Sequence, residues 1–524
     1  MREKIKKILP KRRIHESEKV YQRRWHILGV LCLSLLIVMV GNTTLNVALP
    51  RLSEDLAATN TQLQWLVDSY SLVFAGFLFL AGSVGDRFGR KGILQTGLVL
   101  FGAASAYAAF GVDTANQLIA ARALMGLAGA MIMPATLSIL TNVFPNEERA
   151  RAISLWAGIS GAGMAFGPLL TGFILEHGSW HGAFLINIPL ILVALVSGAL
   201  LVPRSSDPGQ TKFDIFGSIL SVFGLTSIVY AIIEAPNHGW LGAETLGVFG
   251  LGFIIMALFV WWELRAKHPM LDVRLFKIAA FGVSSLVLSL VFFALMGMFF
   301  NMSQLMQLVW GYQPLDSAVK MLPMSLVMVV GSILSPRLVE RFGKKVVVGS
   351  GMLIMSVGVA MLATMGVSPN YIVLVTSMCI AALGMATAMS PTTDLMMSAV
   401  PRARAGMGSA MNDTTRELGG SLGVAVLGSL LASQYGSKIA PAIANLPDQA
   451  KEIAASSLAG ALKISEMLPE PIRVSVLSVA KEAWISGFRR ALVVGAIIIA
   501  ISSLVAFIWL PNKSEESLDE VVHG

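Results

Sequence analysis

The sequence predicts an all-α polytopic membrane protein, and three observations support this prediction. Hydrophobic residues make up 55% of the 524 positions and charged residues only 13%, whereas soluble domains carry about 25% charged residues. Apolar runs of about 20 residues, the length that a helix needs to cross a bilayer, recur from Trp25 to Leu510. The charged motif Asp86–Lys91 returns as Glu340–Lys345, which indicates two homologous halves.

The apolar runs predict fourteen membrane spans, separated by polar segments that are mostly short. A run of about 20 residues suits a helix that rises about 1.5 Å per residue through the hydrocarbon core. The expected spans are residues 26–50, 62–83, 93–111, 117–140, 152–175, 183–202, 215–234, 245–264, 279–308, 317–336, 346–366, 371–393, 406–432 and 486–510.

The fourteen spans group into two six-helix bundles with two additional spans between them. The two copies of the charged motif are separated by more chain than six helices with short loops would occupy. Residues 433–485 are too polar to cross a membrane and predict an outer insert of amphipathic helical pieces, which caps the mouth or lies on the membrane interface. The expected domains are a basic cytoplasmic tail (1–25), the N-terminal bundle (26–203), the two additional helices (204–278), the C-terminal bundle with the insert (279–510) and a second cytoplasmic tail (511–524).

Lys and Arg gather in alternate loops and predict the orientation of the chain. With the N-terminus inside, the inner segments collect many basic residues, whereas the short outer loops hold little beyond Arg51 and Lys320, as is typical of a chain whose inner side is cytoplasmic. Both termini are therefore expected in the cytoplasm, and the protein in the cell (inner or plasma) membrane. The same pattern explains the net charge of +8 without a nucleic-acid partner. Cys32 and Cys379 lie within apolar runs, where we expect small buried hydrophobic residues and no disulfide.

The sequence contains no motif typical of enzymes or of ATP-driven pumps. A Walker loop, a Rossmann fingerprint, zinc-ligand spacing and a Ser/His/Asp arrangement are all absent. We therefore expect no enzymatic activity, no metal and no cofactor. The expected partners are the lipid bilayer and small molecules, and the expected state is a monomer.

The stretch Gly82–Lys91 predicts a tight charged loop on the inner side. Its glycines permit the turn, and its basic residues fix the side of the membrane that it faces. A carboxylate in this loop and in its second copy can cap a helix or pair with Arg when the inner side closes. We expect these hairpins to latch one conformation, with fixing of topology alone as the alternative. The residues concerned are Gly82, Asp86, Arg87, Gly89, Arg90, Glu340 and Arg341.

Acidic residues deep within the expected spans are the candidates for coupling, because a charge in hydrocarbon needs a partner, a cavity or a function. Asp68 is expected to exchange a proton for a cation, or to accept a structural hydrogen bond, and Trp65 on the same face would line the cavity. Glu417 is expected as a second proton or cation site, since Arg416 can pair with Asp413 three residues away. Asp413 is a further candidate, with that intrahelical ion pair as the alternative.

Other polar residues also lie within expected spans. The guanidinium of Arg122 cannot be relieved by losing its proton. We expect it to face water or a carboxylate in the cavity, with packing against polar backbone near a loop as the alternative. Asn301, Gln304 and Gln307 step by three along another span, where they line the cavity or hydrogen-bond to adjacent helices.

A group of small residues in the span 152–175 predicts a close helix contact. Gly163, Gly167 and Gly172 let neighbouring backbones approach, and Pro168 removes a helix hydrogen bond. The pattern suits a bendable gate between the halves, or only a tight contact between helices.

Several motifs together resemble one transporter family. The sequence carries Asn-Val-Ala-Leu-Pro at 46–50, Trp-Leu-Val-Asp-Ser-Tyr-Ser-Leu at 65–72 and Ala-Arg-Ala-Leu-Met-Gly at 121–126. To these it adds the charged loop at 82–91 and the Gly-Pro pattern at 163–172. On these residues the chain resembles the fourteen-helix drug:proton antiporter family of the major facilitator superfamily, in particular its QacA-type multidrug exporters.

The resemblance implies the major facilitator fold and a function. That function is efflux of amphipathic, cationic compounds, such as quaternary ammonium compounds, dyes and biocides, by alternating access in exchange for protons. The resemblance links Arg122 to proton coupling and places Glu417 where these exporters carry an acidic residue. Gly41 and Met328, by contrast, stand where the family carries acidic residues, which fits fewer protons or less charged substrates.

Two other functions stay open at the level of the sequence. One is a transporter of a lipid, an anion or a metabolite with weak or no proton coupling, which the glycine at position 41 would fit. The other is a membrane sensor or scaffold without turnover, although both expected tails are short for a signalling domain.

Overall fold

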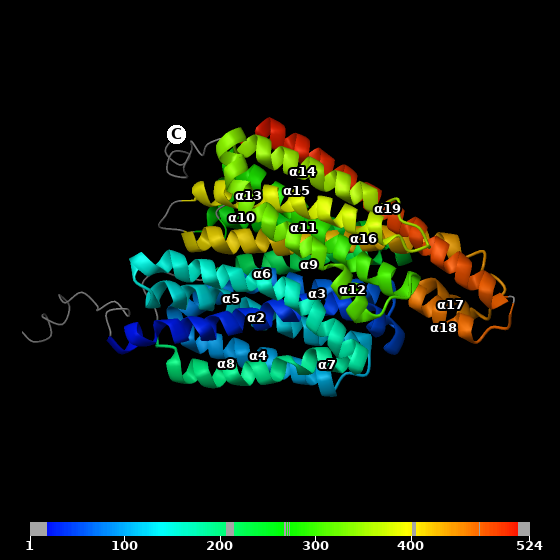
Figure 1. Ribbon diagram of the computed structural model, residues 1–524, viewed down its shortest axis with the longest axis horizontal. Coiled ribbons are helices and arrows are strands. Elements are labelled where there is room, and N and C mark those ends of the chain that lie inside the picture. Colours follow the sequence, from blue (N-terminus) through cyan, green and yellow to red (C-terminus); the bar gives the residue numbers. More distant parts are fainter. Residues whose placement is uncertain are drawn as a thin grey trace, which may run out of the picture.

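The apolar stretches form long helices that run side by side along the length of the molecule (Figure 1). The computed structural model describes residues 18–205, 214–266, 269, 271, 273–400, 405–470 and 472–511, and every regular element within them is a helix. Two large apolar cores, one built almost entirely from residues 27–202 and one from residues 259–510, hold the helices together. The chain is therefore organised as two helical bundles.

The N-terminal bundle forms the lower half of Figure 1, from blue to cyan-green. Two of its helices, α3 and α5, begin with capping boxes: in α3 the side chain of Thr59 accepts from the backbone N–H of Gln62, whose side chain accepts from Thr59. The helices of this bundle are α2 (Glu18–Asp55), α3 (Asn60–Phe88), α4 (Arg90–Phe110), α5 (Ala115–Val143), α6 (Asn146–His177), α7 (Trp180–Leu185) and α8 (Asn187–Leu201).

The C-terminal bundle forms the upper half, from green to red (Figure 1). A 3₁₀ turn, η2 (Val273–Lys277), leads into it, and α11 (Ala279–Gln304) ends in a π-helical turn, η3 (Leu305–Val309). The remaining helices are α12 (Pro314–Lys320), α13 (Leu322–Phe342), α14 (Lys344–Leu362), α15 (Tyr371–Ser398), α16 (Ala405–Ile439), α17 (Asp448–Ser456), α18 (Leu458–Glu466) and α19 (Ile472–Trp509).

Two additional helices, α9 (Ile215–His238) and α10 (Ala243–Arg265), form a hairpin that lies against both bundles. Leu72 of α3, Val229 of α9 and Ala425 of α16 belong to one small apolar cluster. Helix α9 therefore packs at the seam where the two bundles meet.

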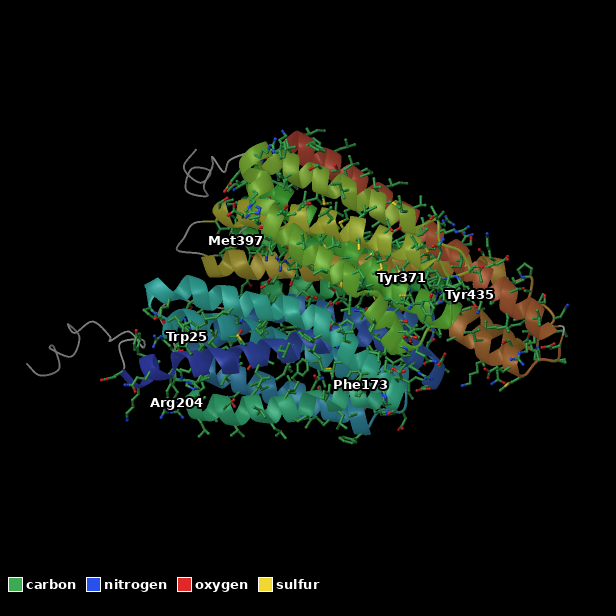
Figure 2. The ribbon with its side chains drawn as sticks, viewed as in Figure 1. Trp25, Phe173, Arg204, Tyr371, Met397 and Tyr435 are labelled. Atoms are coloured by element: carbon green, nitrogen blue, oxygen red, sulfur yellow. The ribbon has the colours of Figure 1, made fainter. Side chains whose placement is uncertain are left out.

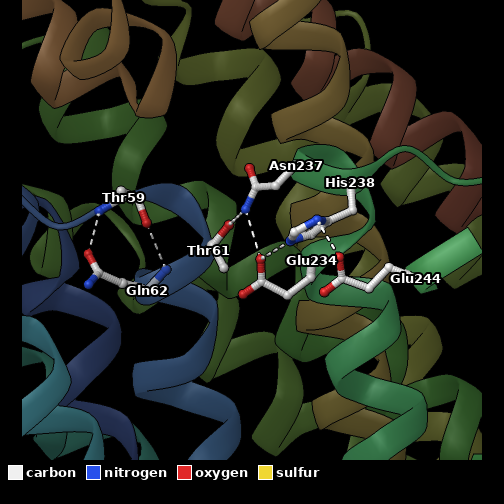
Figure 3. Close-up of polar contacts among 7 residues, drawn as sticks. All are labelled: Thr59, Thr61, Gln62, Glu234, Asn237, His238 and Glu244. Carbon is white, nitrogen blue, oxygen red and sulfur yellow. Dashed lines mark hydrogen bonds and ion pairs between the residues drawn. The ribbon is translucent and has the colours of Figure 1, made fainter. Parts of the chain in front are cut away.

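Polar contacts fix the turn of this hairpin to both neighbours. Asn237 Nδ2 donates to Thr61 Oγ1 of α3 at 3.2 Å, and His238 Nδ1 lies 3.0 Å from Glu244 Oε2 (Figure 3). Trp240 Nε1 donates to Ser433 Oγ of α16 at 3.1 Å. The hairpin thus contacts one helix of each bundle at the same end of the molecule.

Residues 433–485, expected as an outer insert, extend α16 and α19 and form α17 and α18 between them. Tyr435 lies beside these short helices (Figure 2), and its hydroxyl donates to the carbonyl of Ala454 at 2.8 Å. Helix α18 also contacts α2 of the other bundle. We call this end of the molecule the insert end, and the opposite end, where residues 18 and 511 lie, the tail end.

Twelve stretches of the described chain are long and apolar enough to cross a membrane. These stretches treat α7–α8, α11–η3 and α12–α13 as continuous. Helices α3 and α6 are 29 and 32 residues long and run within the same bundle, but they are not among the twelve. Each of the fourteen expected spans coincides with a helix, and the number of crossings stays a prediction.

The prediction of a loop from Gly82 to Lys91 was wrong for most of its length. Helix α3 continues to Phe88, and only Gly89, with φ of 126°, separates it from α4. Gly343, with φ of 82°, makes the equivalent turn between α13 and α14. Gly85 instead permits close packing inside the hairpin, because an added Cβ would lie 2.8 Å from Ile93.

Close backbone contacts in the C-terminal bundle yield a stability prediction. A Cβ at Gly384 of α15 would lie 2.4 Å from the carbonyl oxygen of Gly351 on α14, which cannot move aside as a side chain can. We expect Gly384→Ala to lower the stability of the purified protein by about 1–3 kcal/mol, measured as thermal unfolding in detergent. Gly250→Ala is the control, since no atom lies within 4 Å of its added Cβ. Equal melting of the two variants would contradict the packing described.

Candidate functional site

Helices α3 and α16, one from each bundle, face each other along a seam of polar side chains. Gln64, Asp68 and Ser71 lie on one face of α3, because positions i, i+4 and i+7 of a helix fall on the same side. Gln64 is fully buried, and its Oε1 accepts from Ser429 Oγ of α16 at 3.1 Å. The seam therefore begins at the insert end with a hydrogen bond between the two bundles.

Asp68 lies in the middle of this seam. Its side chain is 0% exposed, and neither carboxylate oxygen has a hydrogen-bond partner among the described residues. The hydroxyl of Ser421 on α16 lies within reach of this carboxylate, although the two groups do not meet in the geometry of a hydrogen bond. A buried carboxylate without a donor is costly, and uptake of a proton removes that cost. The position of Asp68 is thus chemically suited to binding and releasing a proton.

Glu417 follows on α16, nearer the tail end. The residue as a whole is partly buried, and Ser71 of α3 lies within hydrogen-bonding reach of its carboxyl group. The charges of Asp413, Arg416 and Arg122 also act on it. Two carboxyl groups from opposite bundles, Asp68 and Glu417, therefore lie along one seam.

The expected pairing of Asp413 with Arg416 is present only as an interaction of their charges. The guanidinium of Arg416 lies over the ring of Phe292, 5.4 Å from its centroid, and its Nε has no partner among the described residues. Arg416 therefore faces α11 in addition to its own helix.

Arg122 of α5 is fully buried and makes three contacts in the N-terminal bundle. Its Nε donates to the carbonyl of Leu66 at 3.1 Å and its Nη1 to the carbonyl of Gly41 at 2.8 Å. The guanidinium lies 4.5 Å from the centroid of the Tyr70 ring, a favourable cation–π distance. Backbone carbonyls and an aromatic ring thus hold this cation, and the charge of Glu417 acts on it from the other bundle.

The same geometry gives a physical reason for the glycine at position 41. A Cβ there would lie 2.7 Å from Cζ of Phe101 on α4, so a longer side chain would have to displace that buried ring. The carbonyl of Gly41 instead supplies oxygen to Arg122. Met328, the second departure, is partly buried and packs against the core of the C-terminal bundle.

The amides expected along one span bond mainly to their own helix. Asn301 Nδ2 donates to the carbonyl of Gly297 at 2.8 Å, and Gln304 Nε2 donates to that of Phe300 at 3.3 Å. Gln307 Nε2 instead donates to the carbonyl of Val47 on α2 at 3.1 Å, across the two bundles. Only the third residue of the stripe therefore joins adjacent helices.

Trp65 lies with its ring against α9. Its ring centroid is 6.0 Å from that of Tyr230. The additional hairpin therefore covers the indole on at least one side, and the role of Trp65 in lining the cavity stays a prediction.

The glycines of α6 make close contacts of two kinds. A Cβ at Gly167 would lie on Thr43 of α2, within the same bundle, whereas one at Gly172 would lie 2.9 Å from Cα of Leu315 in the other bundle. Pro168 lies inside the helix between them. The surroundings of Gly163 lie outside the described part of the chain. The contact of Gly172 with Leu315 joins the two bundles, so it lies where a gate between the halves is expected, whereas the contact of Gly167 does not.

The charged hairpins are at the tail end. Glu340 and Arg341 are exposed, and the guanidinium of Arg341 lies over its neighbour Phe342. Lys344 pairs with Asp394 of α15, within its own bundle. The side chains of Asp86 and Arg87 lie outside the described part of the chain, so the latch stays a prediction.

The contacts between the bundles identify which end is closed. Gln64 with Ser429, Gln307 with Val47 and Gly172 with Leu315 all lie in the half toward the insert end. Helix α18 adds its contact with α2 at the same end. The described structure is therefore closed at the insert end.

This arrangement of two bundles around a polar seam has counterparts among known proteins. Residues 31–424 match the profile of a family described as Major Facilitator Superfamily. The chain belongs to the major facilitator superfamily. It is therefore a membrane transporter and not an enzyme, and the expectation of the superfamily is confirmed.

Several named proteins align with nearly the whole chain. The Multidrug efflux pump LfrA of Mycolicibacterium smegmatis is 35% identical, over 92% of this chain and 95% of the relative. The Methyl viologen resistance protein SmvA of Salmonella typhimurium is 33% identical, over 90% of this chain and 95% of the relative. The Tetracenomycin C resistance and export protein of Streptomyces glaucescens is 30% identical, over 95% and 94%.

Solved structures support the fold. A bacterial homologue of the human lysosomal transporter Spinster, in an inward-facing conformation, superimposes with a TM-score of 0.65 at 16% identity, over 93% of this chain and 96% of that one. The xylose transporter XylE from E. coli, in an inward-open conformation, gives a TM-score of 0.57 at 14% identity, over 95% and 99%. The chain thus has the all-helical major facilitator fold.

The lack of a donor at Asp68 gives a prediction about stability. We expect Asp68→Asn to leave the free energy of unfolding unchanged within about 1 kcal/mol or to increase it, because no hydrogen bond of the described structure is lost. Arg122→Met is the contrasting variant and should lose about 2–4 kcal/mol, since two charge-assisted hydrogen bonds and the cation–π contact with Tyr70 are lost. Thermal unfolding of the purified proteins measures both. A large loss in Asp68→Asn would show a structural acceptor role instead.

Proposed function

We propose that the protein is a proton-coupled multidrug exporter that moves amphipathic, cationic compounds by alternating access. The observation that carries the proposal is the carboxyl group of Asp68, fully buried at the seam of the bundles without a hydrogen-bond donor among the described residues. Three relatives, named for multidrug efflux and for resistance to methyl viologen and tetracenomycin C, support export of foreign compounds. The energy source is the proton gradient, without a cofactor.

The coupling follows from competition for the same carboxylates. A proton on Asp68 or Glu417 neutralises the charge that would attract a cation, so proton and substrate disfavour each other's binding. Arg122 contributes to coupling through its charge, which acts on Glu417 but is held by backbone oxygens of the N-terminal bundle. When the bundles separate at the insert end, α3 and α16 move apart, and both carboxylates become open to protons on that side.

The orientation belongs to the same proposal. We place both chain ends in the cytoplasm and fourteen crossings in the cell membrane, with the protein as a monomer. Support comes from the basic residues at the tail end, where Lys91 Nζ donates to the carbonyl of Ala199 at 2.6 Å and Lys345 Nζ to that of Ile508 at 3.0 Å. Arg204 lies at this end as well (Figure 2). Closure at the insert end then corresponds to a state open to the cytoplasm.

A transporter of a different cargo with weak proton coupling is the second candidate. It is favoured by the way in which Gly41 and Leu66 satisfy Arg122 through backbone carbonyls, without a carboxylate at position 41. The two candidates differ in what Asp68 does. Only the first requires this carboxyl group to titrate during transport.

Efflux from loaded proteoliposomes separates the two functions. With an imposed pH gradient, efflux of a lipophilic cationic dye should exceed that without a gradient, and Asp68→Asn should reduce this difference by about 5–150-fold, the usual range of a coupling free energy. Glu417→Gln should reduce it as well. Asp113→Asn, which changes an exposed carboxylate between α4 and α5, is the control and should transport as the unmodified protein does.

The opposite results would identify the alternative. If collapse of the pH gradient leaves dye efflux unchanged, the antiport proposal fails. If Asp68→Asn keeps the full response to the gradient, the proton is carried by another group.

A further inference from the structure

A pocket of about 550 Å³ lies at the insert end, away from the seam between the bundles. Its lining comes from α16, α19 and the connection between α14 and α15, all within the C-terminal bundle. The polar residues of the lining are Lys438, Glu482, Ser486 and Arg489. The pocket therefore combines two cations, one carboxylate and one hydroxyl outside the transport path.

Helix α19 supplies most of these groups on a single face. Glu482, Ser486 and Arg489 occupy positions i, i+4 and i+7. The Nε of Arg489 donates to the carbonyl of Met365 at 2.7 Å, which fixes the guanidinium at the edge of the pocket. Lys438, at the end of α16, and Glu482 are exposed and have no hydrogen-bond or ion-pair partner among the described residues. The site thus presents one cation and one anion that the described protein leaves unpaired.

The exposed face of α19 between Arg489 and the tail end is apolar. Val493, Ile497, Ile501 and Leu504 are between 47% and 61% exposed on this side of the helix. From Arg489 to Trp509 the helix rises about 30 Å at 1.5 Å per residue, which equals the thickness of the hydrocarbon core. A crossing that runs from Arg489 to Trp509 would place Arg489 at the boundary between headgroups and acyl chains, in the leaflet at the insert end.

We propose that the pocket binds the headgroup of a phospholipid that carries both a phosphate and a primary ammonium group, the ethanolamine class, from the leaflet at the insert end. Lys438 and Arg489 donate to the phosphate oxygens, which form strong charge-assisted hydrogen bonds with such donors. Glu482 accepts from the ammonium group. The acyl chains lie along the apolar stripe of α19, in register with the headgroup above them.

The carboxylate decides the class of lipid. A headgroup with a phosphate but no amine would place its negative charge beside Glu482 without compensation. A quaternary ammonium group compensates the charge but has no N–H to donate to the carboxylate. A primary ammonium group provides both the charge and the donors.

Lipid titration of the purified full-length protein in detergent tests the site. Phosphatidylethanolamine, phosphatidylcholine and phosphatidylglycerol with identical acyl chains are added, and bound lipid is counted by native mass spectrometry. We expect the ethanolamine lipid to bind most tightly and Lys438→Ala to weaken it about tenfold, as loss of one charge-assisted hydrogen bond predicts. Glu482→Gln should remove the preference over phosphatidylglycerol.

Matched variants on the same region serve as controls. Arg473→Ala removes one positive charge from the exposed start of α19, outside the pocket, and Glu470→Gln neutralises one exposed carboxylate nearby. Both should bind lipid as the unmodified protein does. Since Lys438 and Glu482 are exposed, their variants should also melt at the unmodified temperature, which separates loss of binding from loss of folding.

Three results would overturn the proposal. Unchanged binding in Lys438→Ala would remove the pocket as the site. Equal affinity for all three lipids would remove the assignment of the headgroup. Displacement of the lipid by an equal concentration of inorganic phosphate would show a site for a free anion and not for a lipid.

Discussion

The cost of a charge in a medium without water is the constraint on which this structure depends. Each ionisable group between the bundles meets that cost differently. Arg122 meets it with the carbonyls of Gly41 and Leu66 and with the ring of Tyr70. Asp68 has no donor among the described residues, so a proton is the simplest compensation available to it. A permanent cation is thus fixed by the fold, while the acid depends on what enters the seam.

Contacts within one bundle and contacts between the bundles differ in whether they can persist during transport. Arg122 is held entirely by the N-terminal bundle, so its contacts with Gly41 and Leu66 can persist when the bundles move. The contacts of Gln64 with Ser429 and of Gln307 with Val47 cross the boundary and must break when the insert end opens. Neutral hydrogen bonds of this kind contribute about 1 kcal/mol each, which suits an interface that forms and breaks repeatedly. Of the charged groups at the seam, only Arg122 takes its hydrogen bonds from a single bundle, whereas Asp68 and Glu417 lie against the helix of the opposite bundle.

Sequence alone located the helices well because membrane crossing imposes both their length and their hydrophobicity. It failed at Gly82–Phe88, where Asp86 and Arg87 look like loop residues but stand in the last turn of α3, and one glycine suffices for the reversal.

For the site, the sequence selected Asp68 and Glu417 because acids are rare in spans, yet it missed Ser421, since serine is common there. That α3 faces α16 depends on how the halves dock, which no local pattern contains. The spacing of Asn301 and Gln304 likewise identified a stripe but not that their amides would bond to their own helix.

The hairpin of α9 and α10 has a mechanical consequence. Its turn is bonded to Thr61 on one side and to Ser433 on the other, and α9 shares an apolar cluster with α3 and α16. When α3 and α16 move apart, the hairpin cannot keep its hydrogen bonds to both helices. It must then release either Thr61 or Ser433, or move together with one bundle alone. The two additional helices therefore resist opening on that side until one of these two hydrogen bonds is released.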